Sequence, residues 1–184
     1  MRGKRPGEVR AKGRCHVIEF YISRSDGEVK GEFHRSVLEA TAAIPFGAVI
    51  SYAGLAREVG KAQAPRAVAQ ALRWNPRPIV IPCHRVIGSS GALTGYAGNK
   101  LGLKNKLLTL EGVPTTRKGG DPAIRARSMY VAYPGMGAYC LPTCTFLKEA
   151  PPAPVARFAT REGAEGAGMV PCGLCRPDLH PIAH

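Results

Sequence analysis

The chain has 184 residues, of which 45% are hydrophobic, so one or two small folded domains are expected and an intrinsically disordered chain is excluded. Lys and Arg outnumber Asp and Glu by 26 to 13, and the net charge of +13 favours a polyanionic partner such as nucleic acid, although a basic N-terminal arm would also raise the charge. No run approaches the ~20 apolar residues that span a bilayer, and no apolar signal-peptide core follows the N-terminal charges, so we expect a cytoplasmic protein without a membrane partner.

The first half of the chain carries the pattern of short paired helices. Residues 1–30 are basic and are interpreted as an arm or as the remnant of a larger unit. Hydrophobic spacing predicts a helix over 33–44. A second helix is predicted over 51–60, capped by its first residue, Ser51, and a third over 65–74. The last two have the pattern of a helix-turn-helix, which also occurs in proteins that bind no DNA.

An extended apolar run, 79–82, leads directly into Cys83 and His84. A cysteine attacks as the thiolate, and an adjacent imidazole can supply the base that forms it, so the pair indicates a reactive thiol. The alternative is an inert buried cysteine beside a surface histidine. Further along, residues 101–112 are predicted as an amphipathic helix whose inward side chains are Leu101, Leu103, Leu107, Leu108 and Leu110.

The sequence around Cys83 resembles a known family. The stretch NPRPIVIPCHRVIGSSGALTGYAG, with IPFGAVISYAGLA and QAPRAVAQALRWNP before it and LLTLEGV after it, resembles the O6-alkylguanine-DNA alkyltransferases over about residues 33–113. The resemblance implies irreversible, single-turnover transfer of an alkyl group from O6-alkylguanine, or from O4-alkylthymine, in DNA to Cys83. His84 would activate the thiol through a water, and Glu111 would orient His84.

The same resemblance implies roles for further residues. Asn75 braces the turn that carries the thiol, and Tyr52 forms a hydrogen bond to guanine as negative charge develops on it. Arg66 enters the base stack in place of the flipped nucleotide. The remaining contacts with DNA are assigned to Ala67, Arg73, Ser51 and Tyr96, and the pocket for the flipped base to Val86, Ala97 and Leu72.

The second half of the chain contains four cysteines. Cys140 and Cys144, then Cys172 and Cys175, have the spacing of a structural zinc site, and the surrounding segment has too few apolar residues for a core of its own. Disulfides in an exported protein are the alternative. MGAYCLPTC through VARFATREGAEGAGMVPCGLCRPD resembles the zinc-binding methyl-acceptor domain of Ada over about residues 129–181. This implies a second methyl transfer, from a DNA methylphosphotriester to Cys140, whereas a purely structural zinc site is the alternative.

Together these patterns predict a mainly α fold with two modules. A winged-helix-like helix-turn-helix alkyltransferase domain is expected at 31–113, a linker at 114–128 and a small α+β four-cysteine zinc module at 129–184. We expect one Zn²⁺ ion, no organic cofactor, duplex DNA with alkylated bases as partner, and a monomer associated with the nucleoid in the cytoplasm. The alternatives are a protein that binds alkyl lesions or senses methylation without transfer, and a zinc-stabilised RNA-binding protein.

Overall fold

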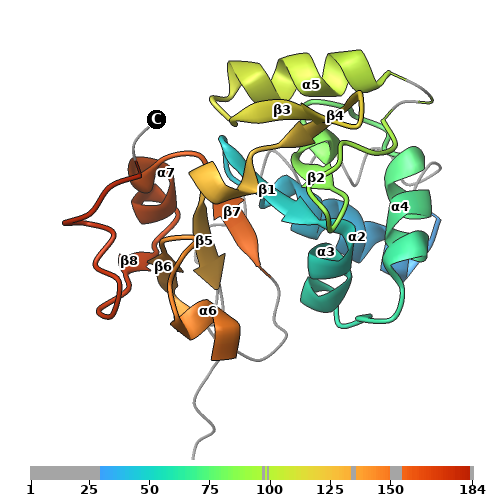
Figure 1. The fold of residues 1–184 in the computed structure, drawn as a ribbon. Helices are drawn as coiled ribbons and strands as arrows, with labels where there is room; N and C mark the ends of the chain where they lie inside the picture. Colours follow the sequence, from blue (N-terminus) through green and yellow to red (C-terminus); the bar gives the residue numbers. More distant parts are fainter. Residues whose placement is uncertain (1–29, 97, 99, 134–135, 150–154, 183–184) are drawn as a thin grey trace, which may run out of the picture.

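The central feature of the fold is a six-stranded sheet with the strand order β2-β1-β7-β5-β6-β8 (Figure 1). It is seen in a computed structural model that describes residues 30–96, 98, 100–133, 136–149 and 155–182. The fold is mixed α/β and not clearly mainly α as expected from the sequence. The strands were not predicted because they are only two to four residues long and carry little alternation in sequence. In chain order they are β1 (Ala48–Ser51), β2 (Val86–Ile87), β5 (Tyr130–Tyr133), β6 (Ala138–Cys140), β7 (Ala156–Phe158) and β8 (Val170–Pro171).

The predicted helices are present close to their expected positions. Ser51 is the N-cap of α3, and its hydroxyl accepts a hydrogen bond from the Gly54 amide at 3.0 Å. Gly60 follows that helix with a φ of 70°, which a glycine adopts without strain. The helices before the second half are α2 (Glu32–Ala42), α3 (Tyr52–Glu58), α4 (Pro65–Arg73), the 3₁₀ turn η1 (Cys83–Arg85) and α5 (Leu101–Leu110), and two short helices follow, α6 (Phe146–Glu149) and α7 (Arg161–Gly166). None of the described helices has the length and apolarity to cross a membrane.

One face of the sheet and the helices α2, α3 and α4 share a single hydrophobic core. Ala48 and Ile50 of β1 lie in this core with Phe158 of β7, and so does Tyr139 of β6. The core and the sheet therefore continue from the first half of the chain into the second. The division into separate modules at 114–128 stays a prediction.

The segment 114–128, expected as a linker, contains regular structure. β3 (Thr115–Lys118) and β4 (Asp121–Ile124) form an antiparallel hairpin, and the 3₁₀ turn η2 (Ala126–Ser128) follows. Gly119 and Gly120 form its turn with φ values of 62° and 92°, and two consecutive positive φ angles are what a tight two-residue hairpin needs. The hairpin packs beside α5 (Figure 1).

The buried face of α5 differs from the prediction. Leu103 and Leu110, expected to point inward, are 45% and 80% exposed, whereas Lys104 is fully buried. Leu108 is buried as expected. A lysine can take an inward position when carbonyl oxygens accept hydrogen bonds from its ammonium group, and Lys104 has two such partners in the site described next.

Candidate active site

Cys83 lies at the start of η1, in a turn that Asn75 holds from the side. The side-chain Nδ2 of Asn75 donates a hydrogen bond to the carbonyl of Ile81 at 2.8 Å. Its Oδ1 accepts one from the backbone amide of Arg77 at 3.0 Å. The Cys83 amide donates to the same Ile81 carbonyl at 2.8 Å. Cys83 is 9% exposed, so the thiol sits at the edge of the core on a fixed backbone. Asn75 therefore contacts the turn that leads into Cys83, and its bracing role stays a prediction.

His84 is buried and bonded to a carboxylate. Its Nε2 lies 2.8 Å from Oε1 of Glu111, which closes α5 as its C-cap residue. The other ring nitrogen, Nδ1, is buried and has no hydrogen-bond partner among the described residues. A carboxylate at Nε2 favours the tautomer with the proton on that nitrogen, so Nδ1 is left with a lone pair that can accept a proton.

Arg85 is a member of this network that the sequence did not reveal. Its Nε lies 2.9 Å from Oε2 of Glu111 and its Nη2 lies 2.8 Å from Oε1, while Nη1 donates to the carbonyl of Ile44 at 2.6 Å. A bidentate pair of this kind fixes the plane of the carboxylate. No motif or spacing marks this arginine, because its partner is 26 residues away in sequence.

The surroundings of Glu111 keep it ionised. Burial raises its pKa, but the hydrogen bonds from His84 and Arg85 and the positive charge of Arg85 outweigh burial and lower the pKa to about 2. The amide of Gly47 also donates to Oε2 at 3.3 Å. Glu111 is therefore a fixed negative charge beside the His84 ring.

The Cys83 thiol needs such a base. Burial raises its pKa, while a hydrogen bond with Asn75 and the positive charge of Lys104 act in the opposite direction. The net direction is upward, so the thiol form dominates at neutral pH and a neighbouring base must remove the proton before attack.

Lys104 is a second residue of the site that the sequence analysis missed. Its ammonium group donates to the carbonyls of Val86 and Thr94, the latter at 2.8 Å, and lies 5.7 Å from the ring centre of Tyr52. Burial lowers its pKa to about 8, opposed by the negative charge that Cys83 can carry. The lysine thus ties the strand after Cys83 to the loop that carries Thr94.

Two tyrosines lie around the thiol. The Tyr52 hydroxyl donates to the carbonyls of Thr94 and Gly95 at 3.1 and 3.2 Å. Burial and the neighbouring Cys83 raise its pKa to about 12. Tyr96 is buried, its ring meets that of His84 edge to face at 6.4 Å, and burial also raises its pKa. Both hydroxyls are therefore protonated donors at neutral pH.

The residues expected to contact DNA or the flipped base differ in their exposure. Arg66, Ala67 and Arg73 are exposed on α4. Of the expected pocket residues, Val86 is fully buried in the same core cluster as Cys83, and Leu72 also lies in that core. Ala97 lies outside the described residues, and Ser51 is the helix cap described above.

The four cysteines of the second half form a cluster. The sulfur atoms of Cys140, Cys144, Cys172 and Cys175 all lie within 4.8 Å of one another, and none of the four is in a disulfide. A tetrahedral zinc site with bonds of ~2.3 Å places its sulfurs about 3.8 Å apart, so the cluster fits a metal ion. The Leu141 amide also donates to the sulfur of Cys175 at 3.4 Å.

The electrostatics of the four thiols also fit a bound metal cation. Burial and the neighbouring thiols raise the pKa of Cys140, and raise that of Cys175 to about 11. For Cys172, backbone hydrogen bonds from Cys175 and Leu174 outweigh burial and lower the pKa to about 7. Several thiolates in one cluster repel one another, and a divalent cation would relieve that repulsion.

Known proteins match the first half of the chain. Residues 32–113 match the family model described as 6-O-methylguanine DNA methyltransferase, DNA binding domain. The constitutive methylated-DNA–protein-cysteine methyltransferase of Bacillus subtilis is 48% identical over 86 residues, covering 47% of this chain and 52% of that protein. The methylated-DNA–protein-cysteine methyltransferase of Rattus norvegicus is 47% identical over 92 residues, covering 50% of this chain and 42% of that protein.

A solved structure is also similar. S. pombe Atl1 in complex with damaged DNA containing O6-carboxymethylguanine has 31% sequence identity and a TM-score of 0.46, covering 50% of this chain and 88% of that chain. The chain spans about half the length of the curated relatives that it matches.

Proposed function

Since residues 32–113 are a 6-O-methylguanine DNA methyltransferase DNA binding domain, we propose that the chain repairs DNA by moving an alkyl group from O6-alkylguanine irreversibly to Cys83. The observation that carries the proposal is the buried 2.8 Å hydrogen bond between Glu111 and His84, the residue that follows Cys83, with Nδ1 of His84 lacking a partner in the described part of the chain. O4-alkylthymine, which presents the same kind of alkyl–oxygen bond, is included in the proposed substrates.

The residues divide the reaction between them. His84 takes the proton of the Cys83 thiol through a water, and Glu111 stabilises the imidazolium that forms. The sulfur then forms a bond to the alkyl carbon as the bond from that carbon to O6 breaks, and the electron pair leaves with guanine. A Tyr52 hydroxyl, protonated at neutral pH, can donate to the departing base once it turns from its carbonyl partners. The thioether has no route back, so each chain acts once.

DNA recognition is assigned to the helix pair. We propose that α3 and α4 act as a winged-helix-like helix-turn-helix, with Arg66 filling the stack where the damaged base has been flipped out and Arg73 contacting phosphate. Both side chains are exposed on α4, on the side away from its core residue Val68. The net charge of +13 favours approach to DNA.

The four-cysteine cluster is proposed to bind one zinc ion in an Ada-like module. The four thiol groups supply a complete set of soft ligands, and no other ligand is needed for a closed structural site. Transfer of a methyl group from a phosphotriester to Cys140 is a second candidate activity. Cys140 is 2% exposed, which favours the structural role unless β6 and the following turn open on DNA.

A protein that binds alkyl lesions without transfer is the competing function. It would need the exposed arginines of α4 but no thiol activated by a buried histidine and carboxylate, so the Cys83 site favours transfer. The test is to incubate the full chain with excess duplex containing O6-[³H-methyl]guanine and to count the label bound to protein. We expect a plateau at one methyl group per chain and none for Cys83→Ser. Tight lesion binding with no label on the protein would establish the competing function instead.

A further inference from the structure

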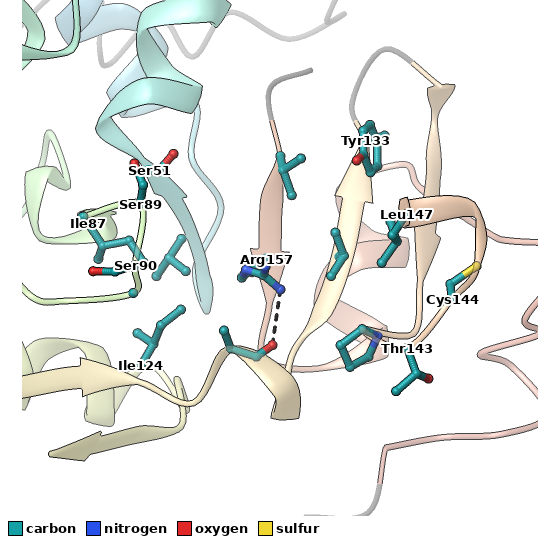
Figure 2. Close-up of a pocket in the computed structure, with 17 residues that line it drawn as sticks. Ser51, Ile87, Ser89, Ser90, Ile124, Tyr133, Thr143, Cys144, Leu147 and Arg157 are labelled. Atoms are coloured by element: carbon teal, nitrogen blue, oxygen red, sulfur yellow. Dashed lines mark hydrogen bonds between the residues drawn. The ribbon is translucent and has the colours of Figure 1, made fainter. Parts of the chain in front are cut away.

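A cleft of about 490 Å³ opens on the face of the central sheet that is turned away from α2, α3 and α4 (Figure 2). Side chains alternate along a strand, so Val49 and Ser51 of β1 reach this face while their neighbours enter the core. Its other walls are the turn 88–91 and the loop 142–144 before α6. The volume lies in the range of small-molecule sites. The cleft contains none of the residues assigned above to alkyl transfer except the helix cap Ser51.

Arg157 of β7 projects into this cleft. It pairs with Val49 on one side and Val131 on the other, so its side chain shares their face of the sheet. Figure 2 shows the side chain between Ser51, Ser89 and Ser90 on one wall and Thr143 on the other. Among the described residues its side chain makes one hydrogen bond, from Nη1 to the carbonyl of Ala126 at 3.2 Å.

Arg157 is the only Lys or Arg that lines the cleft, and Cys144 of the four-cysteine cluster lines it as well. No Asp or Glu lines it, so the half-buried guanidinium has no carboxylate partner there. Burial lowers the pKa of Arg157, opposed by the nearby Tyr133, but an arginine stays protonated in either case. A positive group that is partly removed from water without an ion partner is costly, and a bound anion would offset that cost.

Several hydroxyl groups line the same cleft as the guanidinium. The Ser51 oxygen already accepts from the Gly54 amide, so its own hydrogen is left to donate into the cleft. Ser89 and Ser90 are exposed on the turn at its mouth, and Thr143 faces them (Figure 2). One guanidinium with several hydroxyl donors and no acid is a set of groups that suits a phosphate.

The remaining wall is apolar. Ile87 and Ile124 lie on one side of the guanidinium and Leu147 on the other (Figure 2). Inorganic phosphate alone would leave this apolar surface exposed to solvent, whereas the sugar and base of a nucleotide would cover it.

From these groups we propose that the cleft binds a nucleotide through its phosphate. The Arg157 guanidinium pairs with the phosphate oxygens, Ser51 and Ser90 donate to them, and the apolar wall contacts the nucleoside. The nucleotide is either free or part of a DNA strand that lies along this face. Cys144 of the four-cysteine cluster lies on one wall of the cleft, whereas Cys83, His84 and Glu111 do not line it, so the site does not depend on the proposed alkyl transfer to Cys83.

The test uses the full zinc-loaded chain and two probes. Calorimetric titration with deoxyguanosine monophosphate, with inorganic phosphate as reference, measures binding of a free nucleotide. Fluorescence anisotropy with an undamaged duplex measures binding of a strand. Arg157→Gln is compared with Arg117→Gln, which removes the same charge from an exposed side chain of β3. Ser90→Asp is compared with Ser90→Asn, which has the same size without the charge.

For a free nucleotide, we expect Arg157→Gln to weaken monophosphate binding at least tenfold and Arg117→Gln less than twofold. If the cleft instead binds a nucleotide within a DNA strand, we expect no binding of the monophosphate. In that case Arg157→Gln should weaken duplex binding at least fivefold more than Arg117→Gln does. In either case Ser90→Asp binds more weakly than Ser90→Asn. Equal affinities for Arg157→Gln and Arg117→Gln with both probes would overturn the proposal.

Two further readouts keep the result interpretable. If Arg157→Gln does not fold, the Ser90 pair decides, since both substitutions lie on an exposed turn, and equal affinities of the two would overturn the site. Methyl transfer from O6-methylguanine DNA at saturating concentration should be unchanged in every folded variant. A loss of transfer without a loss of nucleotide binding would therefore point to the Cys83 site and not to the cleft.

Discussion

The two groups of cysteines in this chain are held in place by different means. Cys83 is one thiol on a turn that hydrogen bonds from Asn75 fix, beside a histidine, an arginine and a carboxylate that bond to one another. The four cysteines of the second half lie within 4.8 Å of one another in a part of the chain with short strands and helices. The first site is held by hydrogen bonds among its own side chains, whereas the second is a cluster of thiols that could hold a metal ion.

This difference gives the largest expected effect. Removing the metal with a strong chelator should release one zinc ion per chain, and structural zinc sites of this type contribute of order 10 kcal/mol. Hydrogen exchange should become fast for the amides of β6 and β8, while those of α2 and α3 keep most of their protection. A metal-free chain whose β6 amides stay protected would contradict a metal-dependent second site. Cys15→Ser is the control, and it should keep its zinc.

Loss of the base should be the next largest effect. His84→Gln removes the group that accepts the thiol proton, and general-base catalysis contributes about 100- to 10,000-fold. The measurement is the single-turnover rate of methyl transfer at neutral pH. His34→Gln is a matched control, because His34 is another buried histidine but lies in α2, outside the Glu111 network. If both variants keep the full rate, His84 is not the base.

The Glu111 network should also appear in the pH dependence of stability. The folded-state pKa of Glu111 is about 2, below its ordinary value of 4.5. Its contribution is therefore fully present above pH 4.5 and is lost as the pH falls towards 2. Discounted for solvent screening, it amounts to about 2 kcal/mol. The difference in unfolding free energy between the chain and Glu111→Gln should shrink over that window.

The second half supplies the control for that experiment. Asp178 pairs with Arg176 through a 2.9 Å contact at the surface, and this hydrogen bond lowers its pKa. Asp178→Asn should change the pH profile less than Glu111→Gln, because solvent screens an exposed pair. Equal changes for the two variants would mean that the Glu111 network contributes no more than a surface ion pair.

The smallest expected effect concerns DNA affinity. Arg66→Ala should weaken binding to duplex with O6-methylguanine by about 1–2 kcal/mol, roughly tenfold, because one of the proposed α4 contacts is lost. Arg117→Ala removes the same charge from β3 and should cost clearly less. Anisotropy titrations at two salt concentrations measure both variants. Equal losses would indicate that only net charge matters and that α4 is not the recognition helix.

The sequence predicted the local parts of this molecule better than the parts formed by distant residues. Ser51, Pro65 and the apolar spacing placed α2, α3 and α4, because caps and periodicity are local signals. The strands were missed, since β2 and β8 have two residues each and owe their conformation to their neighbours in the sheet. The hairpin β3–β4 did carry a signal, the Gly119–Gly120 pair, but the charges around it suggested a linker.

The same distinction holds within the site. Cys83, His84 and Glu111 could be named from a resemblance, and the structure brings His84 and Glu111 into contact, but their roles stay predictions. Lys104 was missed because a lysine on an amphipathic helix is expected to face water, and only its carbonyl partners explain its burial. Arg157 was missed because nothing in its neighbourhood in sequence indicates that it faces an uncharged wall of the cleft.

The most direct test of the central claim asks which cysteine receives the methyl group. The full chain is incubated with duplex containing O6-methylguanine and, separately, with duplex containing a methylphosphotriester, and its peptides are then mapped by mass spectrometry. We expect the first substrate to add the mass of one methylene to the Cys83 peptide alone, with Cys140, Cys144, Cys172 and Cys175 unmodified. A methyl group on any other residue with that substrate, or an unmodified Cys83 in a chain that binds the lesion, would contradict the assignment of Cys83 as the acceptor.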